Sequence, residues 1–221
     1  MFLGIYDYTV ILTYISLGIS VFGITRALEG DFKVAIFCLA LSGLCDMFDG
    51  KIARTKKDRT DDEKSFGIQI DSLSDLIAFG ILPACIGIAM LRYIMYIPDL
   101  SGFTKYILTH YNLQAQIVLT AIAVLYVLAA MIRLAYFNVM EEEDQNRDES
   151  GAKIYTGLPV TSAALIFPAV LLVHLLVRAD LTFLYFGVML ITGILFVSKI
   201  CNDFMDFTSV CCNFFRCSFS Q

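Results

Sequence analysis

Two segments decide how this chain is organised: CDMFDGKIAR (Cys45–Arg54) and, after a short charged stretch, FGIQIDSLSD (Phe66–Asp75). Each segment carries one pair of aspartates, Asp46 with Asp49 and Asp71 with Asp75. Residues three or four positions apart lie on the same face of an α-helix. If both segments are helical and adjacent, four carboxylates therefore point into one pocket.

Carboxylates gathered in this way repel one another unless a cation lies between them. A set of oxygen ligands is the kind that hard divalent cations such as Mg²⁺ and Mn²⁺ prefer. Without metal, acids this close would partly protonate instead. The spacing of the aspartates therefore predicts a divalent-metal site.

The composition predicts an integral membrane protein. The 221 residues are 58% hydrophobic and their mean hydropathy is +0.73, which is too apolar for an ordinary soluble domain. Six stretches lack Asp, Glu, Lys and Arg, and most approach or exceed the ~20 residues that cross a hydrocarbon core: Tyr8–Thr25, Val34–Cys45, Leu76–Leu91, Tyr111–Ile132, Ile154–Val177 and Leu181–Ser198. We therefore expect an all-α membrane protein with six transmembrane helices. Residues 1–200 would form the membrane domain, and residues 201–221 a tail with no assigned role.

The basic residues predict the orientation of the chain in the membrane. With six spans, five of the 16 Lys and Arg residues fall on one side, namely Arg26, Lys33, Arg92, Lys105 and Arg178. The other eleven fall on the side of the N-terminus and the aspartate segments, which the positive-inside rule places in the cytoplasm. The protein is thus expected in the cell membrane with a cytoplasmic N-terminus and a cytoplasmic acidic site. Nothing in the sequence indicates a nucleic-acid partner.

The eight fixed positions of Asp46-x2-Asp49-Gly50-x2-Ala53-Arg54 and Gly67-x3-Asp71-x3-Asp75 resemble the signature of the CDP-alcohol phosphotransferases. These are integral membrane enzymes of phospholipid synthesis. The family pattern usually has eight residues between the arginine and the second glycine, whereas twelve lie between Arg54 and Gly67 here. The four extra residues are expected to lengthen a loop.

The resemblance implies a role for each matched residue. Asp46, Asp49 and Asp71 would be metal ligands, and Asp75 would be the base for the attacking alcohol with a share of the second metal. Two divalent ions, Mg²⁺ or Mn²⁺, can hold the attacking and leaving oxygens of an in-line displacement. The remaining matched residues would bind the CDP-lipid: Gly50, Ala53, Arg54 and Gly67. Gly50 and Ala53 leave room for a phosphate, and Arg54 carries a permanent positive charge to bind it.

Two further segments narrow the resemblance. RLAYFNV (Arg133–Val139) and GLPVTSAA (Gly157–Ala164) are similar to segments of bacterial and archaeal phosphatidylserine synthases. Those enzymes transfer phosphatidyl from CDP-diacylglycerol to L-serine and release CMP. Arg133 and Asn138 are then candidates for holding serine, although Arg133 is equally suited to be an anchor at the membrane edge. The resemblance also implies a homodimer.

Three alternatives stay open on the sequence alone. The acceptor alcohol can be inositol phosphate or glycerol phosphate instead of serine. A divalent-cation transporter would also need acids within the membrane. The small polar residues of Thr13-x2-Ser16-x3-Ser20 either lie beside the nucleotide, as a similar family stretch does, or simply let helices pack closely.

Overall fold

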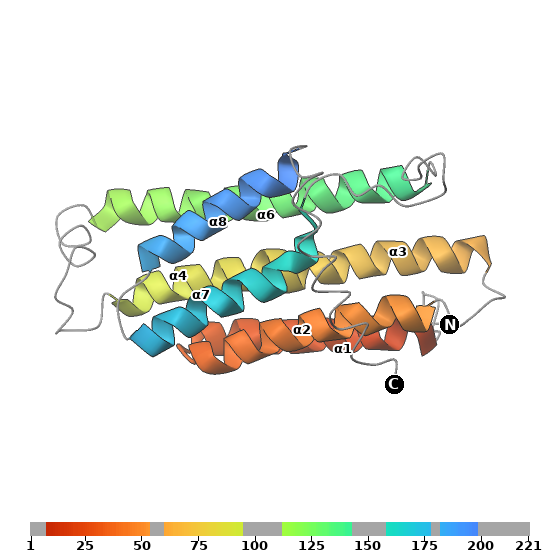
Figure 1. Cartoon of the computed structure of the whole chain (residues 1–221), viewed down its shortest axis with the longest axis horizontal. Helices are drawn as coiled ribbons and strands as arrows, with labels where there is room; N and C mark the ends of the chain where they lie inside the picture. The colour runs from red at the N-terminus through yellow and green to blue at the C-terminus, as the bar shows by residue number, and fades with distance from the viewer. Residues whose placement is uncertain (1–7, 54–59, 95–111, 143–157, 178–181, 199–221) are drawn as a thin grey trace, which may run out of the picture.

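The computed structural model describes residues 8–53, 60–94, 112–142, 158–177 and 182–198, and these ranges contain helices and no strand. Figure 1 shows the helices lying roughly along one long axis. They are α1 (Tyr8–Leu28), α2 (Phe32–Ala53), α3 (Asp61–Asp75), the π-helical turn η1 (Leu76–Ile81), α4 (Leu82–Ile94), α6 (Asn112–Glu142), the 3₁₀ turn η2 (Val160–Ser162), α7 (Ala163–Val177) and α8 (Thr182–Val197). Because α3, η1 and α4 follow one another without a break, the described residues form six helical rods.

Each of the six rods overlaps one of the six stretches expected to span the membrane, which confirms the all-α membrane fold. Three are long and apolar enough to cross a bilayer by length and composition: Val10–Leu28, Glu63–Tyr93 and Leu113–Met140. The apolar helices Val160–Val173 and Thr182–Val197 are shorter, and α2 carries Lys33 and two aspartates. The chain is therefore a multi-pass membrane protein.

Several expected boundaries were wrong, and capping chemistry explains one of them. α3 begins at Asp61, so half of the expected loop between Arg54 and Gly67 is helix. Thr60 caps this helix in a reciprocal arrangement with Glu63, in which each side chain bonds the other residue's backbone N–H. The helix through the second aspartate pair therefore extends well before Gly67.

Proline explains a second correction. The fifth span was expected to begin at Ile154, but Pro159 is extended, with φ −67° and ψ 143°, and α7 begins only at Ala163. Proline also disfavours helical conformation in the preceding residue, here Leu158.

The end of the fourth span was also placed too early. α6 continues ten residues past the expected end at Ile132, so RLAYFNV is helical.

A seam of serines joins α1 to α2. The hydroxyls of Ser20 and Ser42 lie 2.8 Å apart, and the Ser20 hydroxyl also donates to the carbonyl of Ser16 at 2.8 Å. All three serines are buried. Small residues and interhelical hydrogen bonds of this kind let helices approach closely in a membrane. The packing interpretation of this α1 stretch is therefore supported.

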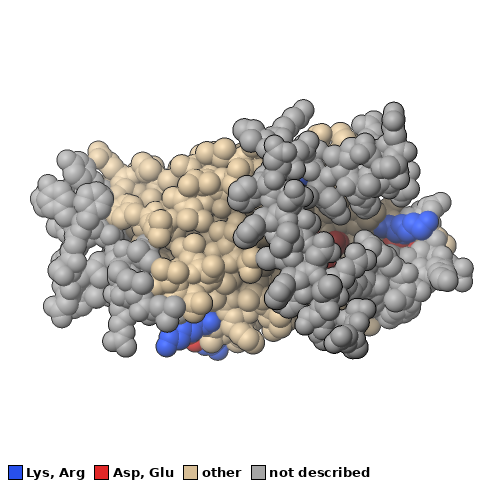
Figure 2. All heavy atoms as spheres, viewed as in Figure 1, with Lys and Arg blue, Asp and Glu red and all other residues tan. Residues whose placement is uncertain are grey.

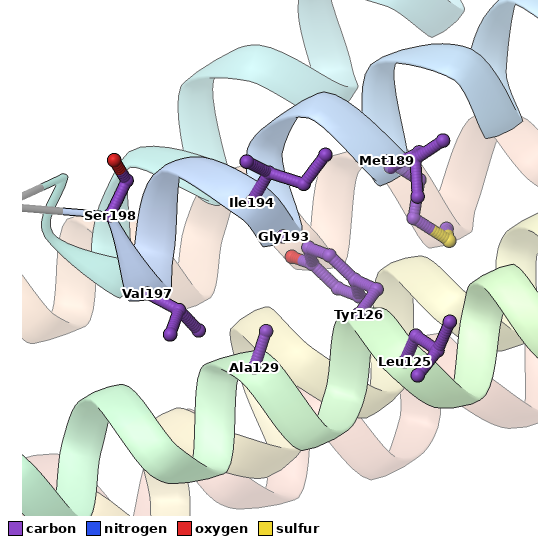
Figure 3. A pocket seen from close by; sticks show the side chains of 9 residues that line it. Leu125, Tyr126, Ala129, Met189, Gly193, Ile194, Val197 and Ser198 are labelled. Carbon is purple, nitrogen blue, oxygen red and sulfur yellow. The ribbon is translucent and has the colours of Figure 1, made fainter. Parts of the chain in front are cut away.

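The surface of the bundle is apolar over a wide area. Figure 2 shows a continuous uncharged region over α4, α7 and α8, with charged side chains of the described residues at its margins. An open groove of about 430 Å³ lies between α6 and α8. Figure 3 shows side chains that line it, among them Leu125, Ala129 and Ile194. A Cβ on Gly193 would lie 3.4 Å from the Cα of Tyr126, so α8 packs closely on α6 at this glycine. Apolar surface of this extent is what lipid chains cover.

Two glycines in the α1–α2 hairpin give a matched test of the packing. A Cβ on Gly43 would overlap the Cβ of Ala164 on α7, whereas a Cβ on Gly18 would meet nothing within 4 Å. We expect Gly43→Ala to lower stability by about 1–3 kcal/mol, because two helices must move apart. Gly18→Ala should leave it unchanged or raise it slightly, since alanine favours helix. Thermal unfolding in detergent micelles measures both, and equal melting temperatures would contradict the α2–α7 contact.

Candidate active site

The aspartates of α2 and α3 converge as their spacing predicts. One carboxylate oxygen from each of Asp46, Asp49 and Asp71 lies within 4.8 Å of the other two. Asp49 is buried, and the other two are half-buried. The side chains of Asp49 and Asp71 come within hydrogen-bonding range of each other. Because α1 packs against both α2 and α3, it holds the two acidic helices in this arrangement.

Helix length places this cluster near one face of the membrane. Asp75 lies 18 residues before Tyr93, the end of the long apolar helix, which is about 27 Å at 1.5 Å per residue. A hydrocarbon core is about 30 Å thick. If Tyr93 lies at one face, Asp75 therefore lies close to the other, where water-soluble molecules reach it.

Asp75 occupies a separate place beside the cluster. It is not among the three residues whose oxygens group within 4.8 Å, yet its carboxyl interacts electrostatically with all three. It is the last residue of α3, and the π-helical turn with buried Ala78 and Phe79 follows directly. The structure therefore places three carboxylates together and a fourth next to the apolar core.

Two serines that the sequence analysis overlooked hold this part of α3 in place. The Ser72 hydroxyl donates to Oδ1 of Asn138 on α6 at 3.0 Å, and the Ser74 hydroxyl donates to the carbonyl of Thr13 on α1 at 3.3 Å. The signal was present in DSLSD, where hydroxyls alternate with other residues between the two acids. Such hydroxyls lie on the helix faces beside the carboxylates, where they can reach neighbouring helices.

The residues expected to bind the CDP-lipid are only partly described. Gly67 is half-buried within α3. Gly50 lies in the last turn of α2, and Ala53 is its final residue. Both therefore belong to the same helix as Asp46 and Asp49. Arg54 lies outside the described residues.

The two residues expected to hold serine do not come together. They are five positions apart on α6, which turns them about 140° from each other around the helix. Arg133 is buried, and its Nε donates to the carbonyl of Leu158 at 3.3 Å. Asn138 instead accepts from Ser72 and lines a groove of about 300 Å³ between α3 and α6. The two candidates therefore lie on different faces of α6, and their contact with serine stays a prediction.

The donor set suits a hard divalent cation. Every ligand atom of the three-residue group is a carboxylate oxygen, and the group contains no sulfur or imidazole nitrogen. Mg²⁺ and Mn²⁺ prefer such oxygens, and partial burial lowers the competition from water. Asp46, Asp49 and Asp71 are thus able to hold such an ion.

Comparison with known proteins identifies the family of the chain. Residues 9–198 match the CDP-alcohol phosphatidyltransferase family, which is most of the chain. The chain belongs to this family. It is therefore an enzyme of the CDP-alcohol phosphatidyltransferase kind, embedded in a membrane.

The chain is also similar to proteins with assigned names. The chain is 26% identical over 200 residues to the CDP-diacylglycerol–serine O-phosphatidyltransferase of Helicobacter pylori, covering 89% of this chain and 71% of that protein. It is 31% identical over 141 residues to the archaetidylserine synthase of Methanothermobacter thermautotrophicus, covering 64% of this chain and 47% of that protein. The chain is 26% identical over 153 residues to a CDP-diacylglycerol–serine O-phosphatidyltransferase of Mycobacterium tuberculosis, covering 69% of this chain and 44% of that protein. No solved structure matches the chain.

A charge-neutral substitution tests the metal site of this phosphatidyltransferase. Asp46→Asn keeps the shape of the side chain but removes its charge, so we expect Mn²⁺ affinity to fall about tenfold or more. Titration followed by electron paramagnetic resonance of free Mn²⁺ measures this without any substrate. Glu29→Gln is the control, because Glu29 is exposed and pairs with Arg26 at 2.7 Å in the turn between α1 and α2. Wild-type Mn²⁺ binding by Asp46→Asn would show that the cluster does not hold the ion.

Proposed function

We propose that this phosphatidyltransferase transfers the phosphatidyl group of CDP-diacylglycerol to L-serine, giving phosphatidylserine and CMP. The observation that carries the proposal is the convergence of Asp46, Asp49 and Asp71 beside Asp75 near one membrane face. A lipid-linked diphosphate and a water-soluble alcohol can meet at such a place. The choice of serine is supported by the names of relatives at 26–31% identity and by the GLPVTSAA and RLAYFNV segments.

The residues divide the reaction between them. Asp75 accepts the proton of the serine hydroxyl as that oxygen attacks the phosphorus attached to diacylglycerol. A new phosphorus–oxygen bond to serine forms, and the bond from this phosphorus to the bridging oxygen breaks. CMP leaves with that oxygen and its electron pair. Asp46, Asp49 and Asp71 would hold the divalent ions, and Arg54 would contact the diphosphate.

Two bound ions, Mg²⁺ or Mn²⁺, would supply charge neutralisation for the diphosphate and the attacking oxygen, with Asp75 sharing the second ion. Gly50, Ala53 and Gly67 give the diphosphate close access to the helices. Arg133 and Asn138 remain the candidates for holding the carboxylate or amine of serine, and only Arg133 carries the positive charge that suits a carboxylate. We also propose that residues 1–200 form the catalytic domain, that the protein is a homodimer, and that its N-terminus and active site face the cytoplasm.

A labelling experiment tests the acceptor and the orientation together. Membranes containing the protein should convert radiolabelled serine and CDP-diacylglycerol into chloroform-soluble product in the presence of Mg²⁺ or Mn²⁺. Inverted vesicles should do so without serine uptake, whereas sealed right-side-out vesicles without an energy source should not, because the site is cytoplasmic. Product only from labelled inositol phosphate or glycerol phosphate would replace serine as the acceptor. Product in right-side-out vesicles alone would reverse the orientation.

Asp75→Asn tests the division of roles among the aspartates. The amide keeps the shape but cannot accept the proton, so turnover should fall on the order of 10²–10⁴-fold. Binding of CDP-diacylglycerol in the presence of metal should survive, because the other three aspartates still hold the ion. Equilibrium binding to the purified protein is compared with turnover, and Asp46→Asn serves as the variant that should lose both. A parallel loss of metal-dependent binding in Asp75→Asn would make Asp75 a metal ligand and not the base.

A further inference from the structure

The π-helical turn η1 lies directly after Asp75. Its wider spacing is shown by the backbone N–H of Leu82, which donates to the carbonyl of Ile77 five residues back. A turn of this kind contains one more residue than the same length of α-helix and is frequent at functional sites. One extra residue rotates everything beyond it by about 100°. The turn therefore sets the face on which α3 presents Asp75 relative to the face on which α4 packs in the core.

Pro83 follows the turn and leaves a carbonyl without its usual partner. Proline has no backbone N–H, so in α-helical register it cannot serve the carbonyl four residues earlier, which is that of Phe79. The hydroxyl of Tyr126 on α6 donates to this carbonyl at 2.5 Å. Buried backbone carbonyls within a membrane need such a donor. A side chain from another helix thus donates to the carbonyl that residue 83 would serve in α-helical register if it were not proline.

α6 packs against the turn at Gly80. A Cβ on Gly80 would lie 3.5 Å from the Cβ of Ala130, an ordinary van der Waals distance, so Ala130 is the part of α6 that lies next to this glycine. Ala130 and Tyr126 are four residues apart and share one face of α6. The contact of Gly80 with Ala130 therefore brings the Tyr126 hydroxyl within reach of Phe79.

Tyr126 is itself rigidly held. It is 1% exposed, and its ring packs edge-to-face on Phe167 with centroids 5.4 Å apart and against Phe196 at 5.7 Å. Figure 3 shows its side chain between α6 and α8, below Gly193. A side chain fixed from several helices can fix the backbone to which it bonds.

We propose that Tyr126 is a positioning residue for Asp75. Through the Phe79 carbonyl it holds the π-helical turn, and the turn holds the end of α3 so that Asp75 faces the cluster of Asp46, Asp49 and Asp71. The bond of Ser72 to Asn138 fixes the same rod on the other side of Asp75. α6 therefore contacts the rod at Ser72, three residues before Asp75, and at Phe79, four residues after it. The inference rests on the role of Asp75 in the proposed function.

Tyr126→Phe tests the proposal because it keeps the ring and removes only the hydroxyl. Misplacement of Asp75 should lower kcat about 10- to 100-fold, with the KM for CDP-diacylglycerol within about twofold of wild type. Tyr185→Phe is the matched control. Tyr185 is equally buried on α8, and its hydroxyl donates at 2.8 Å to the carbonyl of Pro83, which lies beyond the turn. Its kcat should change less than about threefold, even if its melting temperature falls as much as that of Tyr126→Phe.

A double-mutant cycle separates positioning from general stability. If Tyr126 acts through Asp75, adding Tyr126→Phe to Asp75→Asn should lower kcat by less than about twofold relative to Asp75→Asn alone. The same fold loss in both backgrounds would overturn the proposal, since a merely structural effect does not depend on Asp75. Substitution of another acceptor alcohol in the assay leaves this comparison intact.

Hydrogen exchange supplies a readout that needs no turnover. Mass spectrometry of the peptide covering residues 76–86 should show faster exchange in the π-helical turn of Tyr126→Phe than in wild type or Tyr185→Phe. Unchanged protection of this turn would overturn the proposal even if the enzyme used an acceptor other than serine. Faster exchange together with a wild type inactive on every alcohol would reject the proposed function while leaving Tyr126 as the residue that holds the turn.

Discussion

The close approach of the aspartate side chains is the constraint on which the rest of the structure depends. Three carboxylates meet within 4.8 Å, and a fourth interacts with them from the end of α3. Like charges at this distance repel strongly where water is partly excluded. The helices that carry them must therefore be held by contacts elsewhere. A bound cation reverses the sign of this interaction, so the same geometry that opposes folding of the empty site favours metal binding.

The contacts that hold the acidic helices together against this repulsion come from α1 and α6. α1 packs along α2 through the buried serines and accepts a hydrogen bond from Ser74 through the carbonyl of Thr13. α6 contacts the rod formed by α3, η1 and α4 at Ser72 and again at Phe79. Most of these bonds use a backbone carbonyl or a short hydroxyl, which lose little side-chain entropy on ordering. Two helices that carry none of the four aspartates, α1 and α6, thus fix the two helices that carry them.

Periodicity and hydropathy predicted the six helical rods and the grouping of the aspartates, because both depend on local spacing. The start of α3 at Asp61 was missed because a charged stretch resembles a loop, although Thr60 and Glu63 form a recognisable capping box. The late start of α7 was missed because hydropathy does not register the conformation that Pro159 imposes. The π-helical turn had no local signal beyond Pro83. The turn accepts a hydrogen bond from the hydroxyl of Tyr126, which lies 47 residues from Phe79 in the sequence, so this contact cannot be read from local spacing.

The packing beneath the site also argues against an ion pathway. A transporter needs polar groups that continue across the membrane. Immediately beyond Asp75 the third rod is closed by Phe79 and Leu82, which are fully buried. α1, α4, α7 and α8 contain no Asp or Glu, and the remaining acids of the described residues lie at helix ends or in the α1–α2 turn. The Tyr126 hydroxyl, one of the few polar groups at this depth, is already bonded to the backbone. The acidic site therefore ends against an apolar core, which offers no continuous polar route across the membrane among the described residues.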